Sequence, residues 1–382
     1  MTSRERLLCA MSSQEPDHVP LWNLWRSKAQ PFDGRSPQRI PTVLGLGLDD
    51  TLRLEPPWGI SPEVRVTCWK EHPAGERYPI LHKVYETPQG PLKTVVRTSQ
   101  DWPHGDDIPL FSDYNLPRAR EFLVKGREDL DKLAYVLMPP DDQQIVAFRE
   151  EARALRAFAD EHQVLIEGGR IEGGDAAFWL CGVEPLLIAA VEQPGFVAEL
   201  LAFIERWERR RIELCLDAGV EVIVRRGWYE TPDLWSPRLF RQLIAPMLQR
   251  EAALAHQGGA KFRYIMTMGI MPILEEFVEM GVDVLAGVDP VQGGADLEVV
   301  KERLGGRVCI MGGMNAAITL GPGSSREDIR RPVTEAVEVL APSGGFILYP
   351  VDQIFQDTPW QNVLTLIECW REMADYPIAV GK

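Results

Sequence analysis

One short run of residues combines positive charge, aromatic surface and the end of an apolar segment. Residues 222–224 are apolar, and Arg225-Arg226-Gly227-Trp228-Tyr229-Glu230 follows directly. Because a buried guanidinium requires an anionic partner, two adjacent arginines predict one of two arrangements. One is capture of a substrate carboxylate, a phosphate or a folate tail. The other is an internal ion pair, for which the candidate partners are Glu230, Glu167 and Asp289.

The side chains near this run suggest what kind of ligand it would accept. Trp228 and Tyr229 are suited to form a wall for a flat ligand or a methylated cation, and ordinary loop packing is the alternative explanation. Met266 and Met268 alternate with Thr267, which predicts that both point the same way on a strand. They would then line an apolar pocket for a methyl group, or simply fill the core.

Regular alternation of helices and strands must position these residues. After residue 140, apolar segments are expected as strands at Val164–Glu167, Val222–Arg225, Phe262–Met266, Val284–Gly287, Val308–Met311 and Phe346–Leu348. Helices are expected between them, including Asp142–His162, Pro185–Ala218, Pro237–Gln257 and Leu297–Leu304. Six such units, with two more before residue 140, predict a (β/α)8 TIM barrel. An open doubly wound sheet also fits the alternation, but the Gly-rich first turn of a dinucleotide fold is absent.

The segment from about 55 to 115 departs from this pattern, because it is rich in Pro, Gly, Thr and Val. We expect it to be a β-hairpin excursion from a single domain that spans residues 1–382. In a barrel, the reactive side chains come from the carboxyl ends of strands and the loops after them. The predicted substrate-binding residues are Arg26, Trp25, Glu167, Trp228, Tyr229, Met266, Met268, Asp289, Asn315 and Asp352. The predicted catalytic residues are Glu230 as an acid, with Arg225 and Arg226 as an anion clamp.

Composition narrows the class of protein. The 382 residues carry a net charge of −15, which argues against nucleic acid as a partner. The six cysteines are scattered without a Cys-x-x-Cys pair, so no disulfide framework is indicated. No apolar leader or run of membrane-spanning length is present. We therefore expect a cytoplasmic protein that has no membrane span and binds a small molecule.

Short motifs recur along the chain in an order and spacing typical of one family. Near the amino end, Arg4-Glu5-Arg6-Leu7 precedes Pro16-Asp17-His18-Val19-Pro20. Those that follow are Trp235–Phe240, His256–Lys261, Gly281–Leu285, Asp289-Pro290, Leu297–Leu304, Gly312–Asn315, Gly344–Leu348 and Asp357–Val363. Through them the chain resembles the uroporphyrinogen decarboxylase-like superfamily. The resemblance covers both ends well, is weak over residues 30–160, and implies a TIM barrel.

The resemblance implies one of two reaction classes. One branch of the superfamily removes carboxylates from a tetrapyrrole without a cofactor. The other contains corrinoid-linked methyltransferases, whose zinc is held by His-x-Cys at one strand end and by a later Cys. This sequence departs from both: Arg26, with Lys28, is the cationic remnant of the decarboxylase's Arg-rich loop, and Met266, Met268 and Asp352 stand at the zinc-ligand positions.

These departures shape the expected function. Thioethers are poor zinc ligands, so we expect no metal at Met266 and Met268. A metal site formed by carboxylates is an open alternative, with Glu167, Glu230, Asp289 and Asp352 as candidate ligands. The favoured function is methyl transfer from a small methylated substrate to a corrinoid protein or tetrahydrofolate, with no tightly bound cofactor. Two alternatives stay open: metal-free decarboxylation of a small aromatic or pyrrolic acid, and a non-catalytic ligand-binding barrel.

Overall fold

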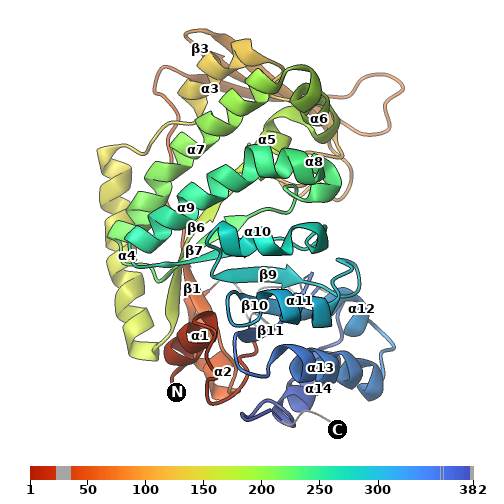
Figure 1. Ribbon diagram of the computed structural model, residues 1–382. Coiled ribbons are helices and arrows are strands. Elements are labelled where there is room, and N and C mark those ends of the chain that lie inside the picture. The colour runs from red at the N-terminus through yellow and green to blue at the C-terminus, as the bar shows by residue number, and fades with distance from the viewer. Residues whose placement is uncertain (23–35, 353, 356, 379–382) are drawn as a thin grey trace. The chain divides into compact units, whose positions relative to one another are not determined.

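The computed structural model describes residues 1–22, 36–352, 354–355 and 357–378 (Figure 1). The chain divides into two compact units. The first contains residues 1–55, 149–170 and 212–382, and the second contains residues 56–148 and 171–211. The expectation of a single domain stays a prediction.

A parallel sheet of seven strands forms the centre of the first unit. Its order is β1 (Thr51–Leu54), β6 (Leu165–Ile171), β7 (Val222–Arg226), β8 (Lys261–Ile265), β9 (Val284–Val288), β10 (Cys309–Asn315) and β11 (Phe346–Val351). The segment Leu21–Trp22 bonds to both ends of this order. Trp22 N donates to Leu348 O at 3.1 Å, and Asp49 N, just before β1, donates to Leu21 O at 3.0 Å. The α/β class predicted from the alternation is confirmed.

Helices connect successive strands of the sheet. In the first unit they are α1 (Ser3–Met11), α2 (Ile40–Gly45), α8 (Pro232–Leu239), α9 (Ala245–Gln257), α10 (Leu274–Glu279), α11 (Leu297–Leu304), α12 (Ala316–Thr319), α13 (Arg326–Leu340) and α14 (Trp360–Arg371). A π-helical turn, Phe240–Ile244, joins α8 to α9, and short 3-10 turns occupy Pro37–Arg39 and Met271–Ile273. In Figure 1, α11 and α13 lie beside β10, against which both pack.

The core of the first unit lies on one face of this sheet. Leu165, Val222, Val284 and Cys309, each near the start of its strand, pack in one cluster with Leu7, Ala10 and Met11 of α1. Helix α1 therefore covers the amino ends of the strands on this face, which we call the inner face. The carboxyl ends are left to the polar residues of the loops.

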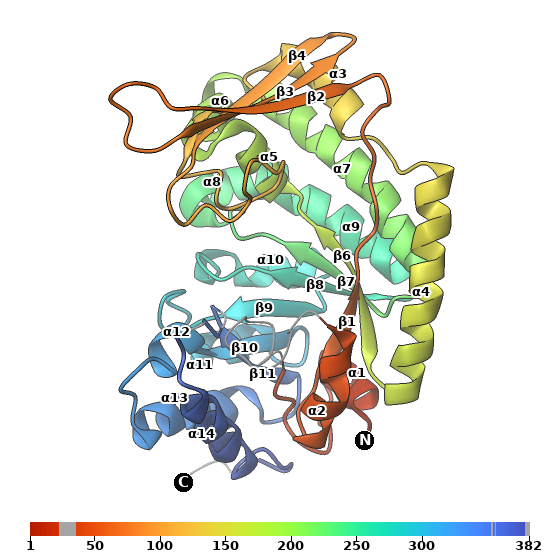
Figure 2. The same cartoon turned by 180° about the vertical axis from the view of Figure 1, so that it is seen from behind.

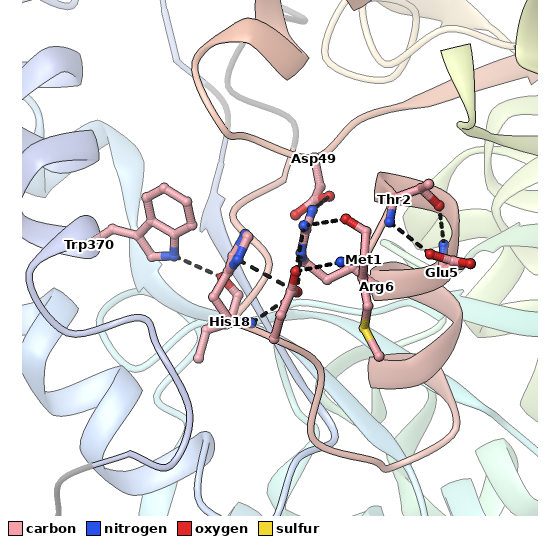
Figure 3. Close-up of polar contacts among 9 residues, drawn as sticks. Met1, Thr2, Glu5, Arg6, His18, Asp49 and Trp370 are labelled. Atoms are coloured by element: carbon pink, nitrogen blue, oxygen red, sulfur yellow. Dashed lines mark hydrogen bonds and ion pairs between the residues drawn. The ribbon is translucent and has the colours of Figure 1, made fainter. Parts of the chain in front are cut away.

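A buried ion-pair cluster fixes α1 in this position (Figure 3). Arg6 donates from Nε to Asp17 at 2.6 Å and from Nη1 to Asp49 at 2.8 Å. Burial raises the pKa of Asp49 to about 6. Partial burial acts in the same direction on Asp17, but hydrogen bonds from Arg6 and the terminal amine outweigh it and lower the pKa of Asp17. The motifs that contain Arg6 and Asp17 therefore stabilise the fold. They lie at the amino ends of the strands, away from the carboxyl ends.

The second unit contains an antiparallel sheet of four strands, ordered β2 (Arg65–Glu71), β3 (Ile80–Thr87), β4 (Gly90–Arg97) and β5 (Ala119–Glu121). Figure 2 shows β2, β3 and β4 side by side. Strands β3 and β4 pair antiparallel on either side of Pro88, where two strands were expected. The sheet has two more strands: β2 lies within the expected excursion of about 55–115, and β5 lies beyond it. Its helices are α3 (Leu130–Val136), preceded by the 3-10 turn Arg127–Asp129, α5 (Gly174–Cys181) and α6 (Val183–Glu192).

Two of the four boundaries between the units lie in long helices, α4 (Asp142–His162) and α7 (Pro194–Asp217). The bounds predicted for α4 and α11 are confirmed. The single helix predicted over Pro185–Ala218 is wrong, because α6 ends at Glu192 and Pro194 starts α7, where a missing backbone N–H is tolerated only in the first turn. Among the described residues, no single helix is long and apolar enough to cross a bilayer, and the bent pair α5–α6 passes that test only by joint length and composition.

Candidate functional site

Side-chain alternation decides which strand residues face the core and which face the helices. On β7, Val222 and Val224 belong to the inner-face cluster, so Arg226 lies on the same face and Arg225 on the other. On β8, Ile265 packs against that cluster, which places Arg263 on the inner face as well. The two neighbouring arginines therefore have different surroundings, as strand geometry predicts.

Arg225 sits in a buried network on the outer face of the sheet. It donates from Nη2 to Glu230 at 2.6 Å and from Nε to Glu251 of α9 at 2.7 Å. Tyr264 O–H donates to the other oxygen of Glu230 at 2.7 Å. Both Arg225 and Glu230 are fully buried. For this pair the geometry favours the internal ion pair over the anion clamp, and it separates Glu230 from the inner face.

Arg226 occupies the contrasting position at the carboxyl end of β7. Its guanidinium carbon lies 3.7 Å from the ring centroid of Trp228, which is a close cation–π contact. Arg226 is buried, whereas Trp228 is 39% exposed. A stacked guanidinium keeps its N–H edge directed sideways, which is the geometry that recognises a carboxylate or phosphate.

Deeper on the inner face, a cluster of buried polar side chains links several strands. Glu167 of β6 accepts hydrogen bonds on Oε1 from Thr51 Oγ1 of β1 and from Arg263 Nη1 of β8, both at 2.7 Å. The guanidinium carbon of Arg263 lies 4.8 Å from the ring centroid of Trp22. Trp22 in turn contacts Tyr349 of β11 edge to face, at 5.5 Å between ring centroids. Glu167 thus stays among the site residues as the partner of a buried arginine.

A second cluster of polar side chains lies at the carboxyl ends of β9, β10 and β11. Asn315 Nδ2 donates to Asp289 Oδ2 at 2.7 Å and to Gln292 at 2.9 Å, and its Oδ1 accepts from Ile318 N to cap α12. Asp289 is fully buried, whereas Asp352 is exposed. Partial burial of its carboxyl, and then the negative charge of Asp289, raise the pKa of Asp352. The structure therefore brings together Asp289, Asn315 and Asp352, as the strand order predicts.

The methionines do not form the expected pair. Strand β8 ends at Ile265, so alternation does not extend to Met266 and Met268. Met266 is fully buried, whereas Met268 is 49% exposed, so the two side chains do not line one buried surface. That both face the same way stays a prediction. Among the residues that the structure describes, no group of three His, Cys, Asp or Glu side chains is placed to hold a metal ion. The residues present do not fit the zinc site of the methyltransferase branch.

The remaining predicted site residues are Trp25, Arg26 and Tyr229. Trp25 and Arg26 lie outside the described residues. Tyr229 is half-buried, and its carbonyl accepts a hydrogen bond from Trp235 Nε1 at 3.1 Å, which anchors the loop after β7. The site residue that sequence analysis missed is Arg263. Its signal was present, because an arginine between Phe262 and Tyr264 interrupts an apolar strand as Arg225 and Arg226 do.

Comparisons with known proteins agree with this architecture. Residues 116–373, about two thirds of the chain, match the family model described as uroporphyrinogen decarboxylase (URO-D). A solved methyltransferase from Methanosarcina mazei is similar at 20% identity and a TM-score of 0.60, covering 97% of this chain and 99% of that one. A 3-keto-D-glucoside 4-epimerase from E. coli is similar at 12% identity and a TM-score of 0.37, covering 58% and 84%. No curated protein sequence matches.

Proposed function

This chain belongs to the uroporphyrinogen decarboxylase family, and we propose that it is an enzyme that transfers a methyl group from a small methylated molecule to a corrinoid protein or to tetrahydrofolate. We further take the sheet of the first unit as a (β/α)8 barrel in which Leu21–Trp22 supplies the eighth strand. The bonds from this segment to Leu348 and Asp49 support that assignment. The active site is then at the carboxyl ends of the strands.

The observation that carries the proposal is the acid at the end of β11. Methyl transfer breaks the bond between the methyl carbon and an oxygen, nitrogen or sulfur, and that atom is a poor leaving group unless it is protonated. Asp352 keeps its proton to higher pH than an ordinary aspartic acid because of its partial burial and the nearby charge of Asp289. It is therefore the group in this site best suited to donate that proton.

The step balances without a metal. The methyl carbon forms a bond to the nucleophilic acceptor as its bond to the donor atom breaks, and the donor atom takes the proton of Asp352. When tetrahydrofolate is the acceptor, its methylated nitrogen then releases its own proton to water. Asp352 is left as a carboxylate, and its exposure lets water restore the proton. Arg226, in cation–π contact with Trp228, holds an anionic part of the acceptor, such as the glutamate tail of tetrahydrofolate, so that the acceptor meets the methyl group in line. No step runs through zinc, because Met266 and Met268 do not fit it.

Metal-free decarboxylation of a small aromatic or pyrrolic acid is the second candidate. The family match favours it, and so do the arginines on the inner face, since a substrate carboxylate needs a fixed cation. The same acid would then protonate the carbanion left by loss of carbon dioxide. A barrel that only binds its ligand is the third candidate, because a fold alone does not establish a reaction.

The decisive experiment gives the protein methyl donors that carry a carboxylate for an arginine on the inner face. The probes are 2-methoxybenzoate, N,N-dimethylglycine and 3-(methylthio)propionate, with cob(I)alamin or tetrahydrofolate as acceptor, and pyrrole-2-carboxylate as the decarboxylation probe. Methylcobalamin is followed by its absorbance, methyltetrahydrofolate by chromatography, and carbon dioxide by its release. Methylated acceptor that forms with wild type and not with Asp352→Asn supports the proposal. The exposed Asp357→Asn is the matched control and retains activity.

The other outcomes overturn it. Carbon dioxide from pyrrole-2-carboxylate, without methyl transfer from any donor, establishes the second candidate. A rise in melting temperature with tetrahydrofolate or hydroxocobalamin, with neither product, establishes binding without catalysis. Full methyl transfer by Asp352→Asn removes the acid from the mechanism.

A further inference from the structure

Arg263 is a buried cation whose hydrogen bonding is incomplete among the residues that the structure describes. It is 1% exposed, and among the described residues Nη1 makes the one hydrogen bond of its guanidinium, to Glu167. Nε is buried without a partner. Buried polar groups are nearly always satisfied, and a charged one has more to gain from a partner than a neutral one. The edge formed by Nε and Nη2 therefore lacks the acceptor that this side chain requires.

The direction of the Arg263 side chain places its guanidinium over the inner face of the sheet. Arg263 starts on β8 and reaches Glu167 on β6, which lies two strands away in the order β6-β7-β8. Its guanidinium also contacts the ring of Trp22, which is bridged to Asp49 just before β1. The side chain therefore crosses the inner face instead of lying along its own strand. Register pairs Arg263 with Val224 and Val284, so its immediate strand neighbours are apolar.

The surroundings of the guanidinium define the ligand. Glu167 neutralises one edge, and its Oε1 already accepts from both Thr51 and Arg263. The ring of Trp22 covers a face of the guanidinium and meets Tyr349 edge to face. The open edge can donate two parallel hydrogen bonds, one to each oxygen of a carboxylate, and the rings of Trp22 and Tyr349 lie beside it.

We infer that Arg263, with Trp22 and Tyr349, forms a binding site for the carboxylate of a small planar molecule. The inference rests on the proposed function only in taking the inner face as the substrate side of the sheet. It adds a substrate class, a carboxylate on a flat ring, and a binding residue distinct from Arg226. It holds for a methoxylated aromatic acid and for an aromatic acid that loses carbon dioxide.

Direct binding tests the inference without turnover, so its failure is separate from failure of the methyl-transfer proposal. The probes are benzoate and benzamide, which share the ring and differ in charge, titrated calorimetrically into the full chain. Wild type is expected to bind benzoate at least tenfold more tightly than benzamide. Because Arg263→Gln alone leaves Glu167 buried without its cation, the test variant is the double change Arg263→Gln with Glu167→Gln. It is expected to lose that preference while binding benzamide as wild type does.

Two controls separate this site from other arginines. Arg241→Met removes an exposed arginine paired with Glu276 and is expected to leave benzoate affinity unchanged. Arg226→Met is expected to reduce benzoate affinity by less than threefold. Equal binding of benzoate and benzamide by wild type overturns the inference. So does unchanged benzoate affinity in a folded double variant, or a preference lost only in Arg226→Met. If the double variant does not fold, two variants of Trp22 replace it. The site is supported if Trp22→Phe keeps the preference for benzoate and Trp22→Ala loses it. Equal benzoate affinity in Trp22→Phe and Trp22→Ala overturns the inference.

Discussion

Arg225 and Arg226 are neighbours on β7, yet Arg225 pairs with Glu251 of α9 while Arg226 lies on the face of the inner core and stacks on Trp228. Successive side chains of a strand point to opposite faces, so two residues of one type acquire two roles. Arg225 belongs to the packing of helix on sheet, and Arg226 belongs to the candidate site. The pair therefore offers a matched comparison between stability and binding.

Replacement of Arg225 by Met should lower the free energy of unfolding by about 3–5 kcal/mol, because it leaves Glu230 and Glu251 buried without their cation. Urea denaturation of wild type and variant measures the difference. Arg241→Met, which removes an exposed ion pair, should cost less than about 1 kcal/mol. A variant at Arg225 as stable as that control would show that the buried network does not stabilise the fold.

Replacement of Arg226 by Met should weaken the binding of tetrahydrofolate, whose glutamate tail carries carboxylates, by about 2–5 kcal/mol. Its melting temperature should change little, since the stacking contact with the partly exposed Trp228 contributes modestly. Calorimetric titration and thermal denaturation of the same preparation give both quantities. Early melting with unchanged affinity would remove Arg226 from the anion site.

Replacement of Asp289 by Asn should lower the pKa of Asp352 toward that of an ordinary aspartic acid, because the negative charge that helps to raise it is gone. Carboxyl carbon resonances followed by NMR during a pH titration report this value without any substrate. Asp357→Asn should leave it unchanged. A pKa of Asp352 that does not respond to Asp289 would contradict the coupling of the two carboxyls.

The ion-pair cluster under α1 should make stability depend on pH. The folded pKa of Asp49 is about 6, above its ordinary value, so its contribution is complete below about pH 4 and is lost as pH rises through 6. Asp17 acts in the opposite sense, because its lowered pKa gives stability above about pH 4 that is lost in acid. Asp49→Asn should therefore gain up to about 3 kcal/mol relative to wild type between pH 4 and 7.

Urea denaturation at pH 4, 5, 6 and 7 tests this dependence. Asp357→Asn is the control, since Asp357 is exposed and its removal should leave the curve unchanged. A constant difference between Asp49→Asn and wild type across this range would show that Asp49 does not titrate with the fold.

Zinc should be absent from the ends of β8. Protein purified without chelator should contain no stoichiometric zinc bound at Met266 or Met268, since neither thioether can replace a thiolate or an imidazole. Elemental analysis measures the content, and dialysis against EDTA should leave tetrahydrofolate affinity unchanged. Zinc coordinated by either methionine would contradict this; zinc held by carboxylates elsewhere would not.

Much of the local structure follows from the order of residue types. Apolar runs such as Val222–Val224 mark a strand buried on both faces, and the stripe of α11 over Leu297–Leu304 marks a helix, because each pattern repeats with the period of its element. Strand polarity then predicts that Asp289, Asn315 and Asp352 meet at one edge, and they do. A boundary set by one proline, as at Pro194, was missed where an apolar periodicity continued across it.

Only the tertiary structure decided which of the charged residues belong to the site. The sequence predicted that Arg225 and Arg226 face opposite ways but left open which faces the core, because that depends on which side the remaining strands pack. It named Glu230 as the catalytic acid and Glu167 as a substrate-binding residue, whereas Glu230 pairs outward with Arg225 and Glu167 pairs inward with Arg263. The contact between Arg263 and Trp22 joins residues far apart in the chain. The local sequence pattern determines whether a segment forms a helix or a strand, but the closing of the sheet determines which residues its side chains contact.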